Sequence, residues 1–396
     1  MAVLSAMVSA FRKEFALSQG TLAIDLGSSS TLVGWQAAPG SPGEVLALPP
    51  LSRSTSDASI PSLVSPSGGS RWLLGQQVIE AGSEADCLRD FKALLGQSNA
   101  PTTAEQAADA LLQGIWQRLP QAIEPQRLVL TAPVQGFAGY RRWLQQWAES
   151  LAIEEVALVD EPTAAALGAG LSPGSLVLVL DIGAGTTDLA LVRLEGGEGR
   201  AMPMAQLLRF AGRSLPERQG QSQRTAKVLG KAGISLGGRM IDRWWAKALG
   251  APEPAPQAWL NAAEALKCAL SKTTSAQVVL ESEAGPRPLQ GSRRELNKVL
   301  DAAGLEPLLD GLLNEVEAAA RRAGESLDSI DAVMAVGGGS ALPWVQQWLQ
   351  RRLPKTELLV TQPLQAVVLG ALAMTPALQV MDVLQHGISL RCWDRR

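Results

Sequence analysis

The sequence has very few of the residues that form many common catalytic and structural sites. Its 396 residues include one histidine, His386, and three widely separated cysteines, Cys87, Cys268 and Cys392. A single histidine excludes a multi-histidine metal site and argues against a Ser/His or Cys/His catalytic pair. Three scattered cysteines argue against a disulfide framework or a thiolate metal site, so we predict a reducing, cytoplasmic environment.

A strong charge imbalance and a long hydrophobic run are also missing. The net charge is −3 and no basic stripe is visible, so nucleic acid is not an expected partner. The opening segment, MAVLSAMVSAFRKEF, has its basic residues after the apolar part and is too short to span a bilayer. We interpret it as a packed or frayed terminal helix, with an amphipathic helix on a membrane surface as the alternative, and expect no stable membrane insertion.

Two common phosphate-binding patterns are absent as well. The sequence contains no G-x-x-x-x-G-K-[ST], and no G-x-G-x-x-G that opens a helix after a strand. The composition, 46% hydrophobic and 18% charged, is typical of a globular protein, and the length suffices for two domains. Strands that alternate with helices along the chain predict an α/β fold.

What the sequence does have is a repeated strand–turn–strand pattern at residues 21–35 (TLAIDLGSSSTLVGW) and 176–194 (LVLVLDIGAGTTDLALVRL). Each copy has an apolar strand, an Asp-x-Gly turn and a second β-rich run, which predicts a β-hairpin. The corresponding residues are Asp25 and Asp181, Gly27 and Gly183, and Ser28, Ser29 and Ser30 against Thr186 and Thr187. One copy would be compatible with ordinary turn chemistry. Two copies indicate two related half-domains that face each other across a cleft.

The residue types in these turns suit a phosphate group with a metal ion. Glycines let the backbone approach closely, and successive N–H groups form a concave nest for phosphate oxygens. Hydroxyl groups add donors, and carboxylates bind hydrated magnesium directly or through its waters. We therefore predict that Asp181 and Asp188 face a metal–phosphate group.

The remaining segments extend the α/β pattern. We expect strands at 125–133 and 156–160, and helices at 140–151, 162–171, 237–249, 259–271 and in two stretches of 292–324. Residues 331–349 are expected to form a strand, a Gly-rich loop and a helix. Trp143 and Trp147 are one helical turn apart and are expected to be core or interface anchors. Glu161 either complements the dipole of the helix that follows it or orients a water in the cleft. Residues 196–233 are interpreted as an exposed insertion.

In order along the chain, these motifs resemble the nucleotide-binding domain of the heat-shock 70 (DnaK-type) chaperones, in the actin-like ATPase superfamily. The matching motifs are AIDLGSSS, DFKALLG, VLTAP, VDEPTAAAL, LDIGAGTTD, LGGRMID, AEALKCALS and VGGGSALP, between about residues 21 and 385. The resemblance implies a two-lobed actin-like ATPase fold of α/β class. Each lobe would be a mixed β-sheet with flanking helices, and ATP or ADP with Mg²⁺ would lie in the cleft between them.

The resemblance also implies a division of the chain. The expected parts are an N-terminal extension (1–20), lobe I (21–174), lobe II (175–361), a C-terminal helix returning to lobe I with a linker (362–385), and a tail (386–396). The family continues through such a linker into a β-sandwich that grips peptides and a helical lid. Here residues 378–396 resemble the linker region, and no substrate-binding domain is expected, either by nature or by truncation.

The resemblance assigns roles to individual residues. Asp25 and Asp181 would hold the hydrated metal, with Asp188 in its outer sphere. Lys92, which alone would be interpreted as a surface lysine, matches the catalytic lysine beside the γ-phosphate and the attacking water, and Glu161 matches an acid that orients water or metal. The phosphate cradle would comprise Gly27, Ser28, Ser29, Gly183, Ala184, Gly185 and Thr186. The ribose and adenine contacts would come from Gly237, Gly238, Glu264, Lys267, Ser271, Gly337, Gly338 and Gly339.

Three departures from the family pattern concern the base and the insertion. Arginines that flank the adenine in chaperones are replaced by Cys268 and Ala341, and an acid near the last motif is replaced by Leu364. The insertion around 196–233 is longer than the usual family segment. We therefore expect a weaker clamp on the base than on the phosphates.

Four functions are compatible with these features. The first is an Hsp70-like, slowly hydrolysing ATPase switch, whose lobe surfaces would bind a co-chaperone or client protein. The second is a filament-forming ATPase like the bacterial actins of the MreB type, which also have motifs like EPTAAALGAGL and DIGAGTTDLAL but do not fit Lys92 or the insertion. The others are a small-molecule kinase on the same fold and a nucleotide-binding scaffold without turnover.

Overall fold

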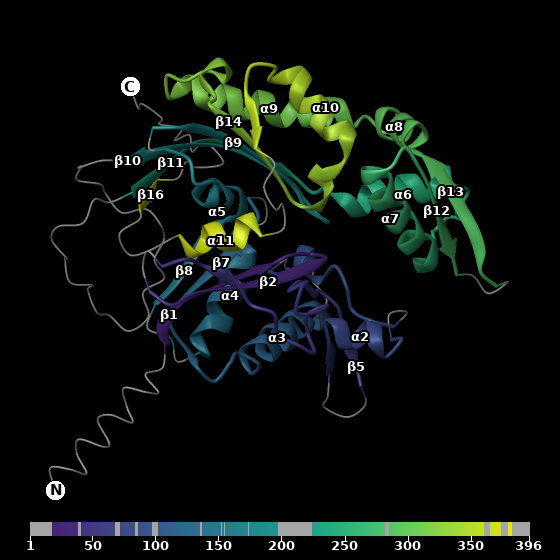
Figure 1. The fold of residues 1–396 in the computed structure, drawn as a ribbon, viewed down its shortest axis with the longest axis horizontal. Helices are drawn as coiled ribbons and strands as arrows, with labels where there is room; N and C mark the ends of the chain where they lie inside the picture. Colours follow the sequence, from purple (N-terminus) through teal and green to yellow (C-terminus); the bar gives the residue numbers. More distant parts are fainter. Residues whose placement is uncertain are drawn as a thin grey trace, which may run out of the picture.

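The protein folds into two lobes of mixed α/β structure, as a computed structural model shows (Figure 1). The structure describes residues 18–38, 41–67, 72–83, 86–96, 102–134, 137–151, 153, 155–172, 174–196, 224–281, 285–359, 365–373 and 379–381. The expected N-terminal helix, residues 197–223 of the expected insertion, Leu364 and the tail with His386 lie outside these residues. Within them, no helix has both the length and the apolar character needed to cross a membrane.

The first lobe is built on a sheet with the strand order β3-β2-β1-β7-β8, in which β4 also pairs with β2. Its strands are β1 (Ser18–Leu26), β2 (Ser30–Gln36), β3 (Glu44–Val45), β4 (Ile60–Pro61), β7 (Ile123–Ala132) and β8 (Glu155–Asp160). Around them lie the short pair β5 (Val64–Pro66) and β6 (Trp72–Leu74), α2 (Gln76–Glu80), the 3-10 helix η1 (Phe91–Leu94), α3 (Thr102–Trp116) and α4 (Phe137–Glu149). Trp143 and Trp147 of α4 are buried in this lobe's core, as their spacing predicted.

The second lobe is built on a sheet with the strand order β15-β14-β9-β10-β11-β16. Its strands are β9 (Leu176–Ile182), β10 (Thr187–Gly196), β11 (Arg224–Ile234), β14 (Ala332–Val336), β15 (Glu357–Leu359) and β16 (Gln379–Met381). The other elements are α6 (Gly238–Ala248), α7 (Gln257–Lys272), the hairpin β12 (Ser275–Leu280) and β13 (Arg287–Ser292), α8 (Arg293–Ala302), α9 (Leu305–Arg322), η2 (Leu327–Ser329), η3 (Gly338–Ala341) and α10 (Pro343–Arg352).

The two sheets have the same connectivity, which confirms the expected internal duplication. In each, a hairpin (β1–β2, β9–β10) is extended on one side by an antiparallel strand, β3 or β11. On the other side, two parallel strands follow, β7 and β8 in the first sheet and β14 and β15 in the second. Because the hairpins occupy equivalent places, their Asp-x-Gly turns lie at equivalent edges of the two sheets.

Two helices, α5 (Glu161–Gly168) and α11 (Ala366–Leu372), lie between the sheets and join the lobes (Figure 1). α5 follows the first sheet but contacts β9 and β10 of the second, whereas α11 contacts β1, β2 and β7 of the first. The helices can cross closely because Gly370 has no side chain. A Cβ at this position would overlap the backbone of Ala164 and force the helices apart. Residues of both sheets and of the two helices form one buried apolar cluster here.

The structure corrects two of the sequence-based expectations and adds one hairpin that was not predicted. Residues 224–233 are not an exposed insertion but belong to β11, with Ala226, Val228 and Ala232 buried; interspersed glycines and lysines hide this strand in the sequence. Pro162 is the second residue of α5 and not the first, because Asp160 is the N-cap. The hairpin β12–β13 was not predicted, since its alternation is weak and largely exposed. The division at residues 174 and 175 stays a prediction.

Candidate functional site

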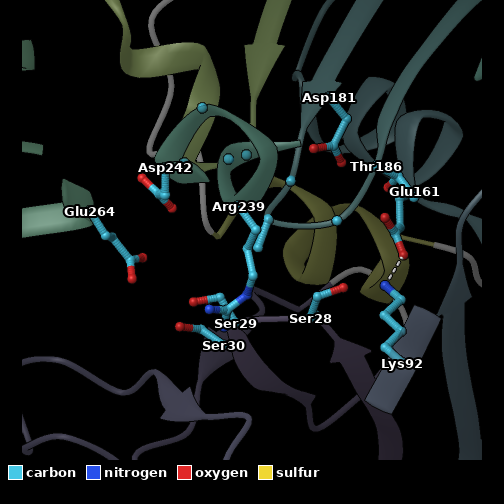
Figure 2. Close-up of a pocket in the computed structure, with 18 of the residues that line it drawn as sticks. Ser28, Ser29, Ser30, Lys92, Glu161, Asp181, Thr186, Arg239, Asp242 and Glu264 are labelled. Atoms are coloured by element: carbon cyan, nitrogen blue, oxygen red, sulfur yellow. Dashed lines mark hydrogen bonds and ion pairs between the residues drawn. The ribbon is translucent and has the colours of Figure 1, made fainter. Parts of the chain in front are cut away.

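The two hairpin turns meet at a cavity of about 270 Å³ between the lobes (Figure 2). A Cβ on Gly185 in the second turn would lie 3.1 Å from the Ser28 Oγ in the first, so the turns are direct neighbours. The cavity is lined by Asp25, Gly27, Ser28, Ser29, Ser30, Arg53, Lys92, Glu161, Asp181, Gly183, Ala184, Gly185, Thr186, Gly238, Arg239, Asp242, Glu264, Lys267, Cys268, Gly337, Gly338, Gly339 and Val367. Residues far apart in the sequence thus form one site.

Backbone groups form much of the wall on the side of the second lobe. The turn after β9 is closed by the Gly183 N–H, which donates to the Thr186 carbonyl at 3.0 Å. The first turn of α6 is tied to it, because the N–H groups of Gly238 and Arg239 donate to the Gly183 and Ala184 carbonyls, each at 2.9 Å. These hydrogen bonds fix the shape of a glycine-rich wall that a phosphate group could approach closely.

A third glycine segment comes close to the acid of β9. Gly337, between β14 and η3, has φ +76°, in the left-handed region that favours glycine. A Cβ at this position would overlap Asp181 Oδ1 and the Ile182 carbonyl. The glycine therefore lets η3 approach the end of β9, where Asp181 is placed.

Lys92 and Glu161 form a buried ion pair at one end of the cavity. Lys92 Nζ donates to Glu161 Oε1 at 2.5 Å, and the side chains are 8% and 10% exposed (Figure 2). Burial would lower the pKa of Lys92, but the charges of Glu161 and Asp25, with Tyr140, outweigh it and raise the pKa. Lys92 is therefore a charged group inside the site and not a surface lysine.

Four carboxylates lie near the Lys92 ammonium group: Glu161, Asp181 and Asp188, which are buried, and Asp25, which is half-buried. Asp25, at the end of β1, accepts a hydrogen bond from the Thr131 hydroxyl at 2.6 Å. Asp181 lies directly opposite Asp188 in the β9–β10 pair, where like charges repel. Burial, followed by the charges of Glu161, Asp188 and Asp25, raises the pKa of Asp181 well above its usual value. The site thus stores negative charge that a bound cation would neutralise.

Asp188 should make stability depend on pH in the nucleotide-free protein. Burial and then the charge of Glu161 raise its pKa to about 7, from 3.8. Because the native state then holds a proton that the unfolded state releases, this aspartate lowers stability progressively between about pH 4 and pH 7. Asp188→Asn removes the effect, so calorimetry at pH 8 should show a melting temperature several degrees above the parent, with a smaller difference at pH 5.

The matched control is Asp328→Asn, which changes a carboxylate that is 87% exposed. It should shift the melting temperature by less than about 1 °C at both pH values, since exposed pairs contribute little. A melting temperature of Asp188→Asn that lies at or below the parent at pH 8 would contradict the assigned repulsion.

Charged side chains of α6 and α7 form the opposite end of the cavity. Lys267 Nζ lies 2.7 Å from Asp242 Oδ1 and 3.2 Å from the Gly238 carbonyl. Burial raises the pKa of Asp242 to about 6, although the charge of Lys267 opposes the shift. Glu264 and Cys268 extend the same face of α7 along the wall. This end is therefore polar, and the α7 residues that line it, Glu264, Lys267 and Cys268, offer no aromatic ring or guanidinium to stack on a base.

The structure brings most of the predicted site residues together, but three do not line the cavity. Asp188 is buried behind it, and the Ser271 hydroxyl donates to the Lys267 carbonyl at 3.1 Å. Gly237 packs against the turn after β9, where a Cβ would lie 2.6 Å from the Gly183 carbonyl. Of the two replaced arginine positions, Cys268 lines the cavity and Ala341 does not. The roles assigned to these residues stay predictions.

Four lining residues were not singled out from the sequence: Arg53, Arg239, Asp242 and Val367. Two of them had a signal, because Arg239 and Asp242 lie in the LGGRMID motif. Asp242 is one helical turn after Gly238 and therefore on the same face of α6. Arg53 and Val367 had none, since only the tertiary fold brings them to the cavity.

The donor set suits a hydrated magnesium ion better than a metal held by the protein alone. Among the residues that the structure describes, no group of three or more His, Cys, Asp or Glu side chains is arranged to hold a metal. Asp25 and Asp181 both line the cavity, and Mg²⁺ typically keeps several waters while one or two carboxylates and substrate phosphates hold it. The residues present fit that arrangement.

Two family profiles match different parts of the chain. The MreB/Mbl protein family matches residues 102–218, and the Hsp70 protein family matches residues 252–386. Individual relatives carry chaperone names. The chain is 28% identical to an HscA homolog of Acidithiobacillus ferrooxidans over 67% of this chain and 41% of that protein. It is 32% identical to the chaperone protein dnaK1 of Prochlorococcus marinus strain MIT 9313, over 53% of this chain and 29% of that protein.

A third relative, the chaperone protein DnaK of Thermus thermophilus, is 28% identical over 65% of this chain and 41% of its own length. The aligned region thus covers about two fifths or less of each of these chaperones. Both family matches fall on elements of the duplicated fold, from α3 to β10 and from α7 to α11. Together, the matches show that this chain is similar to the MreB/Mbl and Hsp70 protein families, which confirms the resemblance to the nucleotide-binding domain of the Hsp70 chaperones and the two-lobed fold.

Proposed function

We propose that this protein is an Hsp70-related molecular switch that binds ATP and hydrolyses it slowly to ADP and phosphate. The observation that carries the proposal is the convergence of two equivalent hairpin turns, one from each lobe, on a single cavity. That cavity also holds Asp25, Asp181 and the Lys92–Glu161 pair. A ligand with phosphates would contact both lobes at once, so its chemical state would affect the spacing of the lobes.

In this proposal the backbone nests of the two turns bind the phosphates, and each named side chain has a separate task. Lys92 is held charged next to the cavity and stabilises negative charge that develops as the terminal phosphoryl group leaves. Glu161, fixed by Lys92, accepts a hydrogen bond from the attacking water and orients it. Asp25 and Asp181 would hold magnesium, which supplies charge neutralisation at the phosphates when it is bound.

The other end of the cavity would hold the nucleoside. Glu264 and the Asp242–Lys267 pair offer an acceptor and a donor for ribose hydroxyls. We further propose that the output is contact of the lobe surfaces with a co-chaperone or client protein, and that the protein acts in the cytoplasm. Both rest on the relationship to the chaperones.

The proposed function predicts magnesium-dependent phosphate release from ATP without any acceptor substrate. A coupled phosphate assay at saturating ATP, with and without Mg²⁺, measures this directly, and isothermal calorimetry measures nucleotide binding. Phosphate transfer that requires an added small molecule would instead indicate a kinase. Absence of any nucleotide binding would contradict the proposal.

A filament-forming ATPase is the second candidate, because the MreB/Mbl profile matches residues 102–218. Sedimentation after addition of Mg–ATP separates the two functions. The switch should stay in the supernatant at concentrations where a filament would pellet, and the pellet of a filament should grow steeply above a critical concentration.

The wall beside the nucleoside predicts weak discrimination between bases. The Cys268 side chain offers no planar group to stack on a purine, and Ala341 does not reach the cavity. Affinities for ATP and GTP should therefore differ by less than tenfold, about 1.4 kcal/mol. Competition calorimetry with the two nucleotides tests this, and a preference for ATP well above tenfold would show that other groups recognise the base.

A further inference from the structure

One ion pair joins the two lobes beside the cavity. Arg239, the second residue of α6 in the second lobe, pairs through its guanidinium with Asp90 Oδ1, which directly precedes η1 in the first lobe. Arg239 lines the cavity, and its side chain extends from α6 towards Ser29 and Ser30 of the opposite hairpin (Figure 2). The pair therefore connects a residue of the cavity wall in the second lobe to the first lobe.

The backbone of each partner is held in its own lobe by hydrogen bonds or by buried neighbours. The Arg239 N–H donates to the Ala184 carbonyl at 2.9 Å, which ties its backbone to the phosphate-side turn. Asp90 is followed by Phe91, which is buried, and by Leu95, which anchors the end of η1 in the lobe I core. An ion pair between two firm anchors restrains the distance between the lobes.

The local charges favour this pairing. Burial raises the pKa of Asp90, and the charge of Arg239, followed by those of Arg89 and Arg243, opposes this rise. Asp90 has φ +57°, and it is the one non-glycine residue with positive φ among those the structure describes. Aspartate and asparagine tolerate this region better than most residues, so the position can carry a carboxylate or its neutral amide without a change of backbone.

We propose that the Asp90–Arg239 ion pair is a latch between the lobes, and that it must open before nucleotide leaves the cavity. The proposal rests on the proposed nucleotide-binding function. The exposed fractions, 35% for Asp90 and 20% for Arg239, mean that water and salt screen the pair. Its contribution is that of a partly exposed ion pair, so we expect it to slow nucleotide dissociation by about fivefold.

Stopped-flow dissociation of a fluorescent ADP analogue from the full chain tests the latch. Arg239→Gln and Asp90→Asn should each raise the dissociation rate about fivefold, and the double variant should be no faster than either single variant. Raising the salt concentration should accelerate dissociation from the parent and leave the double variant unchanged. Arg239→Lys should retain much of the parent behaviour.

Arg243→Gln is the matched control, because Arg243 is one turn further along α6 and acts on Asp90 through its charge without an ion-pair contact in the structure. The ADP analogue should dissociate from this variant at close to the parent rate. Equal rates for Arg239→Gln, Arg243→Gln and the parent would overturn the latch, as would two fully additive single effects.

A second measurement separates failure of the latch from failure of the proposed function. Spin labels at Glu80 of α2 and Val279 of β12 report the lobe spacing in nucleotide-free protein, from exposed sites on the two lobes. Arg239→Gln should widen this distance distribution relative to the parent and to Arg243→Gln. If nucleotide does not bind but the distribution widens, the latch stands and the nucleotide assignment fails. An unchanged distribution contradicts the latch.

Discussion

Replacement of Lys92 by alanine should lower the single-turnover rate of ATP hydrolysis by tenfold to a hundredfold, about 1.4 to 2.7 kcal/mol. The ammonium group acts on charge that develops in the transition state, whereas the backbone nests and the metal bind the ground state. ATP affinity should therefore stay within a few-fold of the parent. Rapid-quench measurement of the rate and calorimetric measurement of the affinity test the two parts separately.

The structure adds a complication that this experiment must address. Lys92 is the partner of buried Glu161, and removal of one member of a buried pair costs about 3 to 5 kcal/mol of stability. The double variant Lys92→Ala/Glu161→Gln removes the unpaired carboxylate, so it should recover much of the melting temperature but none of the rate. Lys355→Ala, which changes a lysine that is 86% exposed, should leave both quantities unchanged. If the Lys92→Ala variant hydrolyses ATP at the parent rate, Lys92 has no catalytic role.

The fold could be predicted where the sequence pattern is local. Apolar runs that end in Asp-x-Gly specify the two hairpins, and their repetition indicates the duplication that the sheets show. β11 could not be recognised because Gly230, Gly233 and two lysines interrupt its apolar pattern, although tertiary packing buries the strand between β10 and β16. Burial from a neighbouring layer leaves no periodic signal in the strand itself.

The site could be predicted where backbone chemistry requires particular residues, as at the glycines of the two turns and at Gly337. Partnerships between distant side chains could not be predicted. Nothing in the sequence pairs Asp90 with Arg239 or Asp242 with Lys267, because each pair forms only when separate elements are packed together. The resemblance to the chaperones placed Lys92 near the phosphates, and the structure adds that Glu161 is the group that holds it.

Because of the buried acids, Mg–ATP is expected to reverse the order of stability of the parent and the Asp181→Asn variant. Without nucleotide, burial and then the charges of Glu161, Asp188 and Asp25 raise the pKa of Asp181 well above 3.8. The native state then binds a proton that the unfolded state lacks, so this aspartate costs stability above about pH 4. Asp181→Asn should therefore melt at a higher temperature than the parent at pH 8, with a gap that narrows towards pH 4.

Mg–ATP should reverse the order. The carboxylate that is unfavourable in the empty site would face the hydrated cation, so its loss should weaken magnesium-dependent ATP binding about a hundredfold. At ligand concentrations that saturate the parent, the variant then gains about 2.7 kcal/mol less stability than the parent. Asp25→Asn should also weaken binding, since Asp25 lines the same cavity.

Thermal unfolding at pH 8 with and without Mg–ATP, supported by calorimetric affinities, measures this reversal. ATP without magnesium should leave Asp181→Asn the more stable protein, because the carboxylate then has no cation to face. If Asp181→Asn binds Mg–ATP and hydrolyses it as the parent does, Asp181 is not a metal ligand. Its burial opposite Asp188 would then have no functional explanation in this site.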